Sequence, residues 1–240
     1  MKIALLGYGK MGKAIAELAK DRGHLIEVTI DNEQEWEQRG KQLAACDVAI
    51  DFTTPDTAVR NIYRCFDLDV PVVVGTTGWY DSYHSLCDYC RKEGKALFAA
   101  TNFSIGMNIV FELNCRLAQM MNRYPEYSVA ISETHHIHKL DSPSGTAITL
   151  ANDAIASLDR MDAWHRQGSG DNPRSLPIAS MREGEVAGVH EVVYDSDIDT
   201  VTLVHRAKSR KGLALGAVLA AEFLSGKRGC YTMKDLLSGQ

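Results

Sequence analysis

The chemically richest stretch of this chain is ETHHIHKLDSPSGTA, from Glu133 to Ala147. It holds three of the chain's eight histidines within four residues, and a lysine follows at once. Clustered imidazoles suit a metal site, whereas a histidine close to a lysine suits proton transfer. A polar strand that runs into a loop is the third, non-catalytic interpretation.

Side-chain alternation separates these histidines. The stretch is entered through YSVAIS, a run typical of a strand, in which successive side chains point to opposite faces. Glu133 and His135 then share one face, and Lys139 joins them if the strand continues that far. His136 and His138 share the other face, where no third ligand is evident. The pattern therefore disfavours a metal site, and we expect none.

The residues that follow predict a helix that begins beside an anion pocket. Asp141 or Ser142 suits the N-cap position, and Pro143 suits the first helical turn. The Ser-Gly-Thr at 144–146 would then offer free N–H groups and two hydroxyls. A small molecule that bears carboxylates, with a proton donor beside it, fits this combination.

A glycine-rich loop near the start of the chain predicts a dinucleotide site. Residues 7–12, GYGKMG, match G-x-G-x-x-G, close a predicted strand and open a predicted helix. In this motif the first glycine makes a tight turn, the second admits a pyrophosphate and the third packs helix against strand. Asp31 ends the next predicted strand, where a carboxylate accepts hydrogen bonds from an adenosine ribose. A plain tight turn and a strand cap are the structural alternative.

Two further loops are expected beside the nicotinamide. Residues 75–78 and 100–103 each follow an apolar strand, and ligands lie beyond the carboxyl ends of strands in an open parallel sheet. Ordinary turn chemistry explains both loops equally well. The expected cofactor-binding residues are Gly7, Tyr8, Gly9, Lys10, Met11, Gly12, Asp31, Gly75, Thr76, Thr77, Ala100, Thr101, Asn102 and Phe103.

The choice between NADH and NADPH depends on the charges near Asp31. Its carboxylate should repel a 2′-phosphate, and Asn32 adds no positive charge. Lys10 could reach such a phosphate from the glycine loop. We expect NADH to serve at least as well as NADPH.

Strands and helices alternate through the first 103 residues. The runs KIALLG, HLIEVTID, DVAIDFT, VPVVVG and ALFAATN predict buried strands, and helical patterns lie between most of them. This alternation predicts an α/β fold with a doubly wound parallel sheet of the Rossmann type. One of the helices is expected to bury Val59, Ile62, Tyr63 and Phe66, and Gly94 is expected to end another.

The later part of the chain predicts a second, α+β domain on an open mixed sheet. GVHEVVYD and DTVTLVHRA predict a hairpin that turns at 195–199, residues 166–177 predict a loop, and GLALGAVLAAEFL predicts a helix. A long helix is expected to bury Ile109, Leu113, Leu117 and Met121. A second helix is expected to bury Ala147, Leu150, Ala151, Ala154 and Leu158.

Composition argues against several classes of partner. The net charge is −5 and the pI about 5.9, so there is no basic excess for a nucleic acid. No apolar run is long enough to span a membrane, and the apolar start of the chain is too short for a signal peptide, so we expect a cytoplasmic protein. Cys87 and Cys90 form a C-x-x-C without a second pair for zinc, and we expect two thiols on one helix.

Taken together, these motifs resemble those of the 4-hydroxy-tetrahydrodipicolinate (dihydrodipicolinate) reductases of bacterial lysine and diaminopimelate biosynthesis. ETHHIHKLDSPSGTA resembles the signature E-x-H-H-x-x-K-x-D-x-P-S-G-T-A, with Thr134 and Ser142 in place of common alanines. GYGKMG is similar to the family's glycine loop, with Lys10 where arginine is common. VVVGTTG, ATNFSIG, REGEVAGVHEVVY and HRAKSRKGLALGAVLAA resemble other family segments.

The resemblance implies NAD(P)H-dependent reduction of 4-hydroxy-tetrahydrodipicolinate, a small dicarboxylate, to tetrahydrodipicolinate. His135 would be the acid/base residue, and Lys139 a second proton donor or charge stabiliser. The substrate-binding residues would be His136, Lys139, Ser144, Gly145 and Thr146.

The resemblance also implies a domain plan and an assembly. Residues 1–103 plus 213–240 would bind the dinucleotide, and residues 104–212 would bind substrate and form a homotetramer. The two lobes would close on hinges near 103–106 and 209–212.

Three rival functions stay open on the sequence alone. Another two-lobe NAD(P) dehydrogenase of amino-acid metabolism has no ready use for the His-His-x-x-Lys and Ser-Gly-Thr pairing. A non-catalytic NAD(P)-binding regulator would bind cofactor without turnover. A zinc hydrolase would carry stoichiometric metal after purification.

Overall fold

The computed structural model describes every residue except Asp171 and Gln240. The chain divides into two compact units: residues 1–105 with 211–240 form unit 1, and residues 106–210 form unit 2. Both crossings between the units lie two residues from the expected domain boundaries. Within the described part of the chain, no helix is long and apolar enough to cross a membrane.

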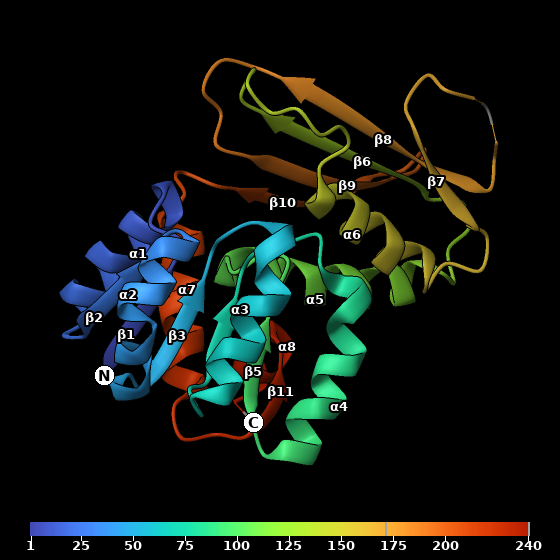
Figure 1. Cartoon of the computed structure of the whole chain (residues 1–240). Helices are drawn as coiled ribbons and strands as arrows, with labels where there is room; N and C mark the ends of the chain where they lie inside the picture. Colours follow the sequence, from blue (N-terminus) through green and yellow to red (C-terminus); the bar gives the residue numbers. More distant parts are fainter. Residues whose placement is uncertain (171, 240) are drawn as a thin grey trace. The chain divides into compact units, whose positions relative to one another are not determined.

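Unit 1 is built on a parallel sheet with the strand order β11-β5-β4-β3-β1-β2 (Figure 1). Its central strands consist of buried apolar residues, as expected of strands that are covered on both faces. The strands are β1 (Lys2–Leu6), β2 (Leu25–Ile30), β3 (Val48–Asp51), β4 (Val72–Val74), β5 (Ala96–Ala99) and β11 (Gly229–Tyr231).

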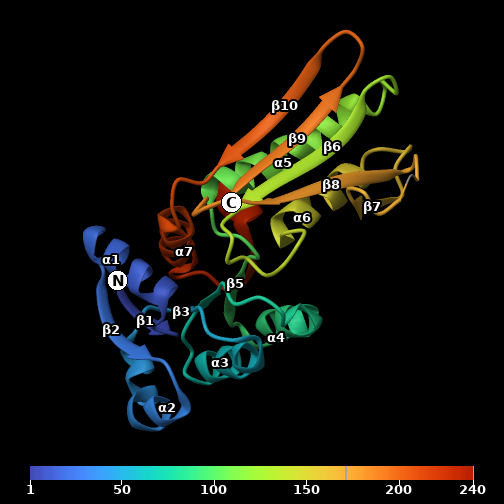
Figure 2. The same ribbon diagram turned by 90° about the horizontal axis from the view of Figure 1, so that it is seen from above.

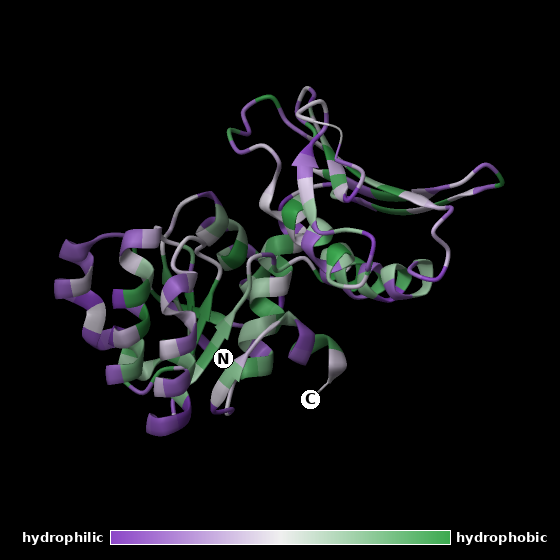
Figure 3. Cartoon of the chain, turned by 90° about the vertical axis from the view of Figure 1, so that its right-hand side faces the viewer, coloured by the Kyte–Doolittle hydropathy of each residue, from purple (hydrophilic) through white to green (hydrophobic). Residues whose placement is uncertain are grey.

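Helices cover both faces of this sheet (Figure 2). One apolar cluster joins the sheet to α3 and α4, and the other joins it to α1 and α7. In Figure 3 the strands of unit 1 are hydrophobic, whereas the outer faces of the helices are hydrophilic. The helical elements are α1 (Lys10–Asp21), α2 (Glu33–Arg39), η1 (Gly40–Ala45), α3 (Pro55–Asp67), η2 (Tyr80–Ser82), α4 (Tyr83–Glu93), α7 (Lys211–Leu224) and α8 (Met233–Ser238).

The strand order creates a crevice beyond the carboxyl ends of β1 and β3. The chain leaves β1 toward β2 on one side and returns to β3 on the other, so the connecting helices lie on opposite faces. In doubly wound sheets, ligands bind at this switch point. The glycine loop after β1 and the segment after β3 therefore border the natural site for a dinucleotide.

Unit 2 is built on a mixed sheet with the strand order β10-β9-β6-β8-β7. β6 pairs parallel with β8 and antiparallel with β9, and α5 and α6 share one apolar cluster with these strands. The elements are α5 (Ile105–Met121), β6 (Ser128–His135), α6 (Gly145–Ile155), β7 (Ala163–Arg166), β8 (Ser175–Arg182), β9 (Val189–Asp195) and β10 (Thr200–Arg206). The predicted α+β character, the β9–β10 hairpin and the buried face of α6 are confirmed.

Several expectations about local structure are wrong. β6 ends at His135, so the condition under which Lys139 would share its face is not met. Ser144, not Asp141 or Ser142, is the N-cap of α6, and its side chain accepts a hydrogen bond from the Ala147 N–H. The loop expected at 166–177 includes the start of β8, and its residue 171 lies outside the described residues.

Two helices bury faces that differ from those expected. In α5, Ile109 and Leu113 are 45% and 46% exposed. This helix is apolar on several sides, and Asn114 fixes the buried side by donating to the Leu150 carbonyl at 2.9 Å. In α3, Tyr63 is 38% exposed, although Ile62 and Phe66 are buried as expected.

The cysteine expectation is also wrong in part. Cys87 on α4 forms a disulfide with Cys230 on β11, across 143 residues of sequence. Cys90, on the same helix, is buried and free, as expected. The short strand β11 has a weak sequence pattern, so the pairing of α4 with this edge strand was not visible in the C-x-x-C spacing.

A close approach of α7 to the segment after β5 gives a stability test. A Cβ at Gly216 would lie 1.7 Å from the carbonyl oxygen of Phe103, whereas a Cβ at Gly212, on the same helix, would have its nearest neighbour at 3.8 Å. We expect Gly216→Ala to lower the free energy of unfolding by about 1–3 kcal/mol, because the backbone must shift. Gly212→Ala is the matched control and should be neutral or stabilising. Urea unfolding of both variants measures this, and equal stability would contradict the packing described.

Candidate active site

The glycine loop between β1 and α1 forms a cradle whose geometry suits a pyrophosphate. Gly7 has a φ of +86°, and a Cβ there would lie 2.2 Å from the Phe52 carbonyl oxygen. A Cβ at Gly12 would lie 2.2 Å from the carbonyl oxygen of Gly7. Gly9 is the N-cap of α1, and no described atom lies within 4 Å of where its Cβ would be. The N-terminus of α1 is therefore open to an anion.

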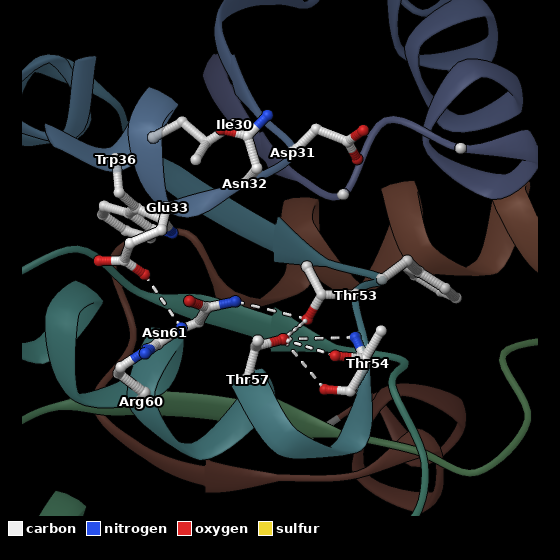
Figure 4. A pocket seen from close by; sticks show the side chains of 13 residues that line it. Ile30, Asp31, Asn32, Glu33, Trp36, Thr53, Thr54, Thr57, Arg60 and Asn61 are labelled. Atoms are coloured by element: carbon white, nitrogen blue, oxygen red, sulfur yellow. Dashed lines mark hydrogen bonds and ion pairs between the residues drawn. The ribbon is translucent and has the colours of Figure 1, made fainter. Parts of the chain in front are cut away.

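Asp31 lies beside this loop, at the end of β2. Its carboxylate accepts a hydrogen bond from the Tyr8 backbone N–H at 2.7 Å, which ties the strand end to the glycine loop. A cavity of about 240 Å³ opens here between β1, β2 and β3 (Figure 4). Its lining residues are Gly7, Gly9, Ile30, Asp31, Asn32, Glu33, Trp36, Phe52, Thr53, Thr54, Thr57, Arg60 and Asn61.

A second cavity, of about 360 Å³, adjoins the first and shares Gly9, Phe52 and Thr53 with it. It brings the loop after β4 next to the start of α1, as the strand order requires. Its lining residues are Gly9, Lys10, Met11, Phe52, Thr53, Pro55, Gly75, Thr76 and Thr77. The two cavities adjoin each other beside the glycine cradle, an arrangement that suits a dinucleotide.

A buried carboxylate, Asp51, organises the loops around these cavities. It accepts hydrogen bonds from the hydroxyls of Thr76 at 2.6 Å and Thr53 at 2.8 Å, and from the amide of Asn61 at 2.8 Å. Burial raises the pKa of Asp51, and these hydrogen bonds oppose that shift. The network fastens the loop after β4 to the loop after β3.

The remaining expected cofactor residues have other positions in unit 1. Tyr8 contributes its backbone N–H to Asp31, and Gly12 packs against Gly7. The segment 100–103 follows β5, and its Ala100 N–H donates to the Val74 carbonyl, so it lies at the same edge of the sheet. The residues Ala100, Thr101, Asn102 and Phe103 do not line either cavity, and the Phe103 ring packs in the core against Phe52 and Phe98.

In unit 2, β6 delivers two neighbouring polar side chains to the buried face of its sheet. Glu133 and His135 are 1% and 8% exposed, and His135 Nδ1 is hydrogen-bonded to the Glu133 carboxylate. Burial tends to raise the pKa of Glu133, but hydrogen bonds and charges that include those of His135 and Arg182 outweigh it and lower the pKa to about 2. The carboxylate is therefore ionised throughout the physiological range.

The start of α6 lies against the same carboxylate. The Ser144 backbone N–H faces the Glu133 carboxylate at 3.3 Å, and the Ser144 hydroxyl is hydrogen-bonded to His190 Nε2 at 3.1 Å. Burial is the largest cause that lowers the pKa of His190, to about 4, so this imidazole is neutral near pH 7. At Gly145 no described atom lies within 4 Å of where a Cβ would be, so the helix N-terminus is open beside it.

Lys139 lies in a turn after β6 rather than on the strand. Its backbone N–H donates to the His136 carbonyl at 3.1 Å, and its ammonium forms an ion pair with Asp141 at 2.8 Å. Arg182, at the end of β8, donates to the carbonyls of both Lys139 and Asp141. The turn is thus held through its backbone carbonyls, and the Lys139 side chain is 21% exposed.

The other two histidines of the stretch differ in burial. His136 is half-buried, and its Nδ1 has no hydrogen-bond partner among the described residues. His138 is exposed and pairs with Glu185 at 3.2 Å, as expected of a surface residue. Thr146 is in the first turn of α6, next to Gly145.

A group with metal-ligand chemistry does form in unit 2, but not from the three clustered histidines. Glu133, His135 and His190 place one ligand atom each within 4.8 Å of one another. The Glu133 carboxylate already accepts from His135 and from the Arg182 guanidinium at 3.1 Å. A cation next to that guanidinium would be repelled, so the group suits a hydrogen-bonded acid/base site better than a metal.

Comparison with known proteins decides the family. A model of the C-terminus of dihydrodipicolinate reductase matches residues 106–237, and a model of its N-terminus matches residues 1–103. The 4-hydroxy-tetrahydrodipicolinate reductase of Christiangramia forsetii is 48% identical over 99% of this chain and 98% of its own length. This chain belongs to the dihydrodipicolinate reductase family.

More distant relatives agree with this family. The 4-hydroxy-tetrahydrodipicolinate reductase of Neisseria meningitidis serogroup B is 34% identical over 81% of this chain and 74% of its own length. A dipicolinate-bound dihydrodipicolinate reductase from Paenisporosarcina sp. TG-14 superposes with a TM-score of 0.75 over 97% of both chains. At 21% identity, that likeness supports the fold, which is the expected one. Members of the dihydrodipicolinate reductase family are NAD(P)H-dependent oxidoreductases.

Several residues of the site were missed by sequence reasoning. The family signature includes Glu133, and its shared strand face with His135 was a usable signal, yet it received no role. His190 and Arg182 come from strands that pair with β6, and no local pattern marks them. In unit 1, the run DFTTPD after β3 supplies Phe52 and Thr53, which the carboxyl-end rule could have identified.

The end of the first cavity that Asp31 lines gives a test of cofactor choice. Asp31 and Glu33 both line it, and Glu33 forms an ion pair with Arg60 at 3.0 Å (Figure 4). Glu33 also forms an ion pair with Arg64. We expect the wild type to use NADH at least as well as NADPH. The Asp31 carboxylate would repel a 2′-phosphate, and the ion pairs with Glu33 keep Arg60 and Arg64 from binding one.

Glu33→Gln should free both arginines and raise the kcat/KM ratio of NADPH to NADH by about tenfold. The matched control is Glu37→Gln, an exposed glutamate on the same helix, which should leave the ratio unchanged. A strong NADPH preference in the wild type would contradict this account.

Proposed function

We propose that this chain catalyses the NAD(P)H-dependent reduction of 4-hydroxy-tetrahydrodipicolinate to tetrahydrodipicolinate in lysine and diaminopimelate biosynthesis. The observation that carries the proposal is the 48% identity to a 4-hydroxy-tetrahydrodipicolinate reductase along nearly the whole of both chains. The two half-sites agree with it, since one suits a dinucleotide and the other a small carboxylate with a proton donor.

The residues of unit 1 fit the cofactor. Gly7, Gly9 and the N-terminus of α1 would hold the pyrophosphate, and Asp31 would accept hydrogen bonds from the adenosine ribose. The loops that carry Thr53 and Thr76 would border the nicotinamide end. When bound, the cofactor supplies the hydride that the conjugated cyclic imine accepts after loss of water.

The residues of unit 2 would bind the substrate and supply the proton. The open N-terminus of α6, with Ser144, Gly145 and Thr146, suits a carboxylate. His136 and Lys139 would complete the anion site. His135 would deliver a proton to the reduced substrate, and the ammonium of Lys139 would stabilise the charge that develops.

We further propose that the protein acts in the cytoplasm as a homotetramer. Support comes from the family pattern and from β10, an edge strand whose Val201 and Val204 are 37% and 38% exposed. Light scattering after gel filtration measures the mass of the assembly, and a monomeric mass would contradict this part of the proposal.

A coupled assay tests the reaction itself. Pyruvate, aspartate semialdehyde and the preceding synthase generate the substrate, and the loss of reduced nicotinamide is followed by absorbance. Synthase-dependent oxidation of NADH or NADPH is expected. Cofactor binding without turnover would instead indicate a regulator.

Two substitutions test the assigned roles. His135→Gln should lower kcat by about 100-fold or more with a modest change in KM, because a proton donor is lost. Lys139→Ala should lower kcat and also raise the KM for the substrate, because it removes charge from both the ground state and the transition state. Steady-state kinetics with saturating cofactor measure both. Near-wild-type turnover in both variants would contradict the assignment.

A further inference from the structure

The Glu133 carboxylate lies at the centre of a buried network that the reaction does not consume. Its side chain is inaccessible to solvent, and each of its two oxygens has an ion-pair or hydrogen-bond partner within the protein. One oxygen bonds to His135 Nδ1. The other accepts from Arg182 Nη1 at 3.1 Å and faces the Ser144 N–H at 3.3 Å. A buried ion with this many partners is held in one geometry.

The two nitrogens of the His135 ring have different surroundings. Nδ1 faces the Glu133 carboxylate, which as an ionised group can only accept a hydrogen bond, so Nδ1 must carry a proton. Nε2 faces Gly188, where an added Cβ would lie 3.1 Å away. A side chain at Gly188 would crowd Nε2, and the glycine leaves that space free. Nε2 is therefore the atom that can exchange a proton with a substrate.

Arg182 extends the network to the turn that carries Lys139. Its Nη2 donates to the Asp141 carbonyl at 2.6 Å, and its Nε donates to the Lys139 carbonyl at 3.3 Å. The same guanidinium holds the Glu133 carboxylate through Nη1. The Glu133 carboxylate is thus connected both to His135 and to the turn that carries Lys139, the two residues with proposed roles in the reaction.

We propose that Glu133 is a positioning residue that fixes His135 in the tautomer protonated at Nδ1, so that Nε2 alone gives up the proton. The inference rests on the proposed function. In the proton-transfer step the Nε2–H bond breaks, and a bond to hydrogen forms at the electron-rich atom that hydride addition creates on the substrate. Neutral His135 keeps its Nδ1–H bond to Glu133, which stays a carboxylate, and solvent returns a proton to Nε2 before the next turnover.

The groups around His135 differ in charge. Glu133, with its low pKa, is ionised, whereas His190 on β9 is neutral near pH 7 because burial lowers its pKa. Arg182 on β8 is shared with backbone carbonyls, and Lys139 is paired with Asp141. The groups that face this site are Glu133, Arg182, His190, His205, Lys139 and Asp141.

Glu133→Gln isolates the role of the charge. The amide oxygen can still accept from Arg182, so the turn is retained, but the imidazolium loses its anion. The step consumes the proton on Nε2 of His135, so kcat should depend on pH. In Glu133→Gln the pH profile of kcat should move toward lower pH, because an anion that favours this proton is lost, and kcat near neutrality should drop at least about tenfold.

The control is a second glutamate–histidine pair in the same unit. Glu185 and His138 form an exposed pair at 3.2 Å, so Glu185→Gln should leave kcat and its pH profile unchanged. Titration with pyridine-2,6-dicarboxylate checks that the anion site persists, and Glu133→Gln should bind it within about threefold of the wild type. Glu133→Asp keeps the charge and shortens the side chain by one methylene. Its kcat should therefore be lower than that of the wild type, whereas the pH profile of kcat should be unchanged.

The outcomes separate this inference from the proposed function. No turnover in the wild type would overturn both. Wild-type turnover together with an unchanged pH profile in Glu133→Gln would overturn only the inference. If Glu133→Gln does not fold, Glu133→Asp decides: full kcat in that variant would overturn the positioning role, and a reduced kcat at an unchanged profile would support it.

Discussion

The constraint on which the proposed substrate half-site depends is the burial of the Glu133 charge. A carboxylate without solvent contact is tolerated only when hydrogen bonds and an opposite charge surround it. Those partners come from three different elements: His135 on β6, Ser144 at the start of α6 and Arg182 on β8. Satisfying the carboxylate therefore sets the helix N-terminus, the imidazole and the Lys139 turn in a fixed relation.

Unit 1 also has a buried, hydrogen-bonded carboxyl group beside its cavities. Asp51 ends β3 without solvent exposure, and the hydroxyls of Thr53 and Thr76 and the amide of Asn61 satisfy it. Both carboxylates lie at or near the end of a strand, where the chain turns into a loop with functional residues. In each unit a buried, hydrogen-bonded carboxyl group gives a loop the rigidity that loops otherwise lack.

Local sequence patterns predicted much of the fold. The spacing of Gly7 to Gly12 and the buried runs predicted the parallel sheet, and the face of α6 follows from its 3.6-residue period. The period of two on β6 placed Glu133 with His135 correctly. Features that depend on non-local pairing were not predictable: Arg182 and His190 reach the site because β8 and β9 flank β6, and Cys87 meets Cys230 because β11 joins the sheet edge.

The protonation state of the His135 ring tests the central claim most directly. Nitrogen-15 NMR of selectively labelled histidine, assigned by comparison with His135→Gln, distinguishes a ring nitrogen that carries a proton from one that does not. For the neutral ring in the wild type, we predict a proton on Nδ1 and a bare Nε2. A neutral ring protonated at Nε2, with Nδ1 bare beside Glu133, would contradict the account.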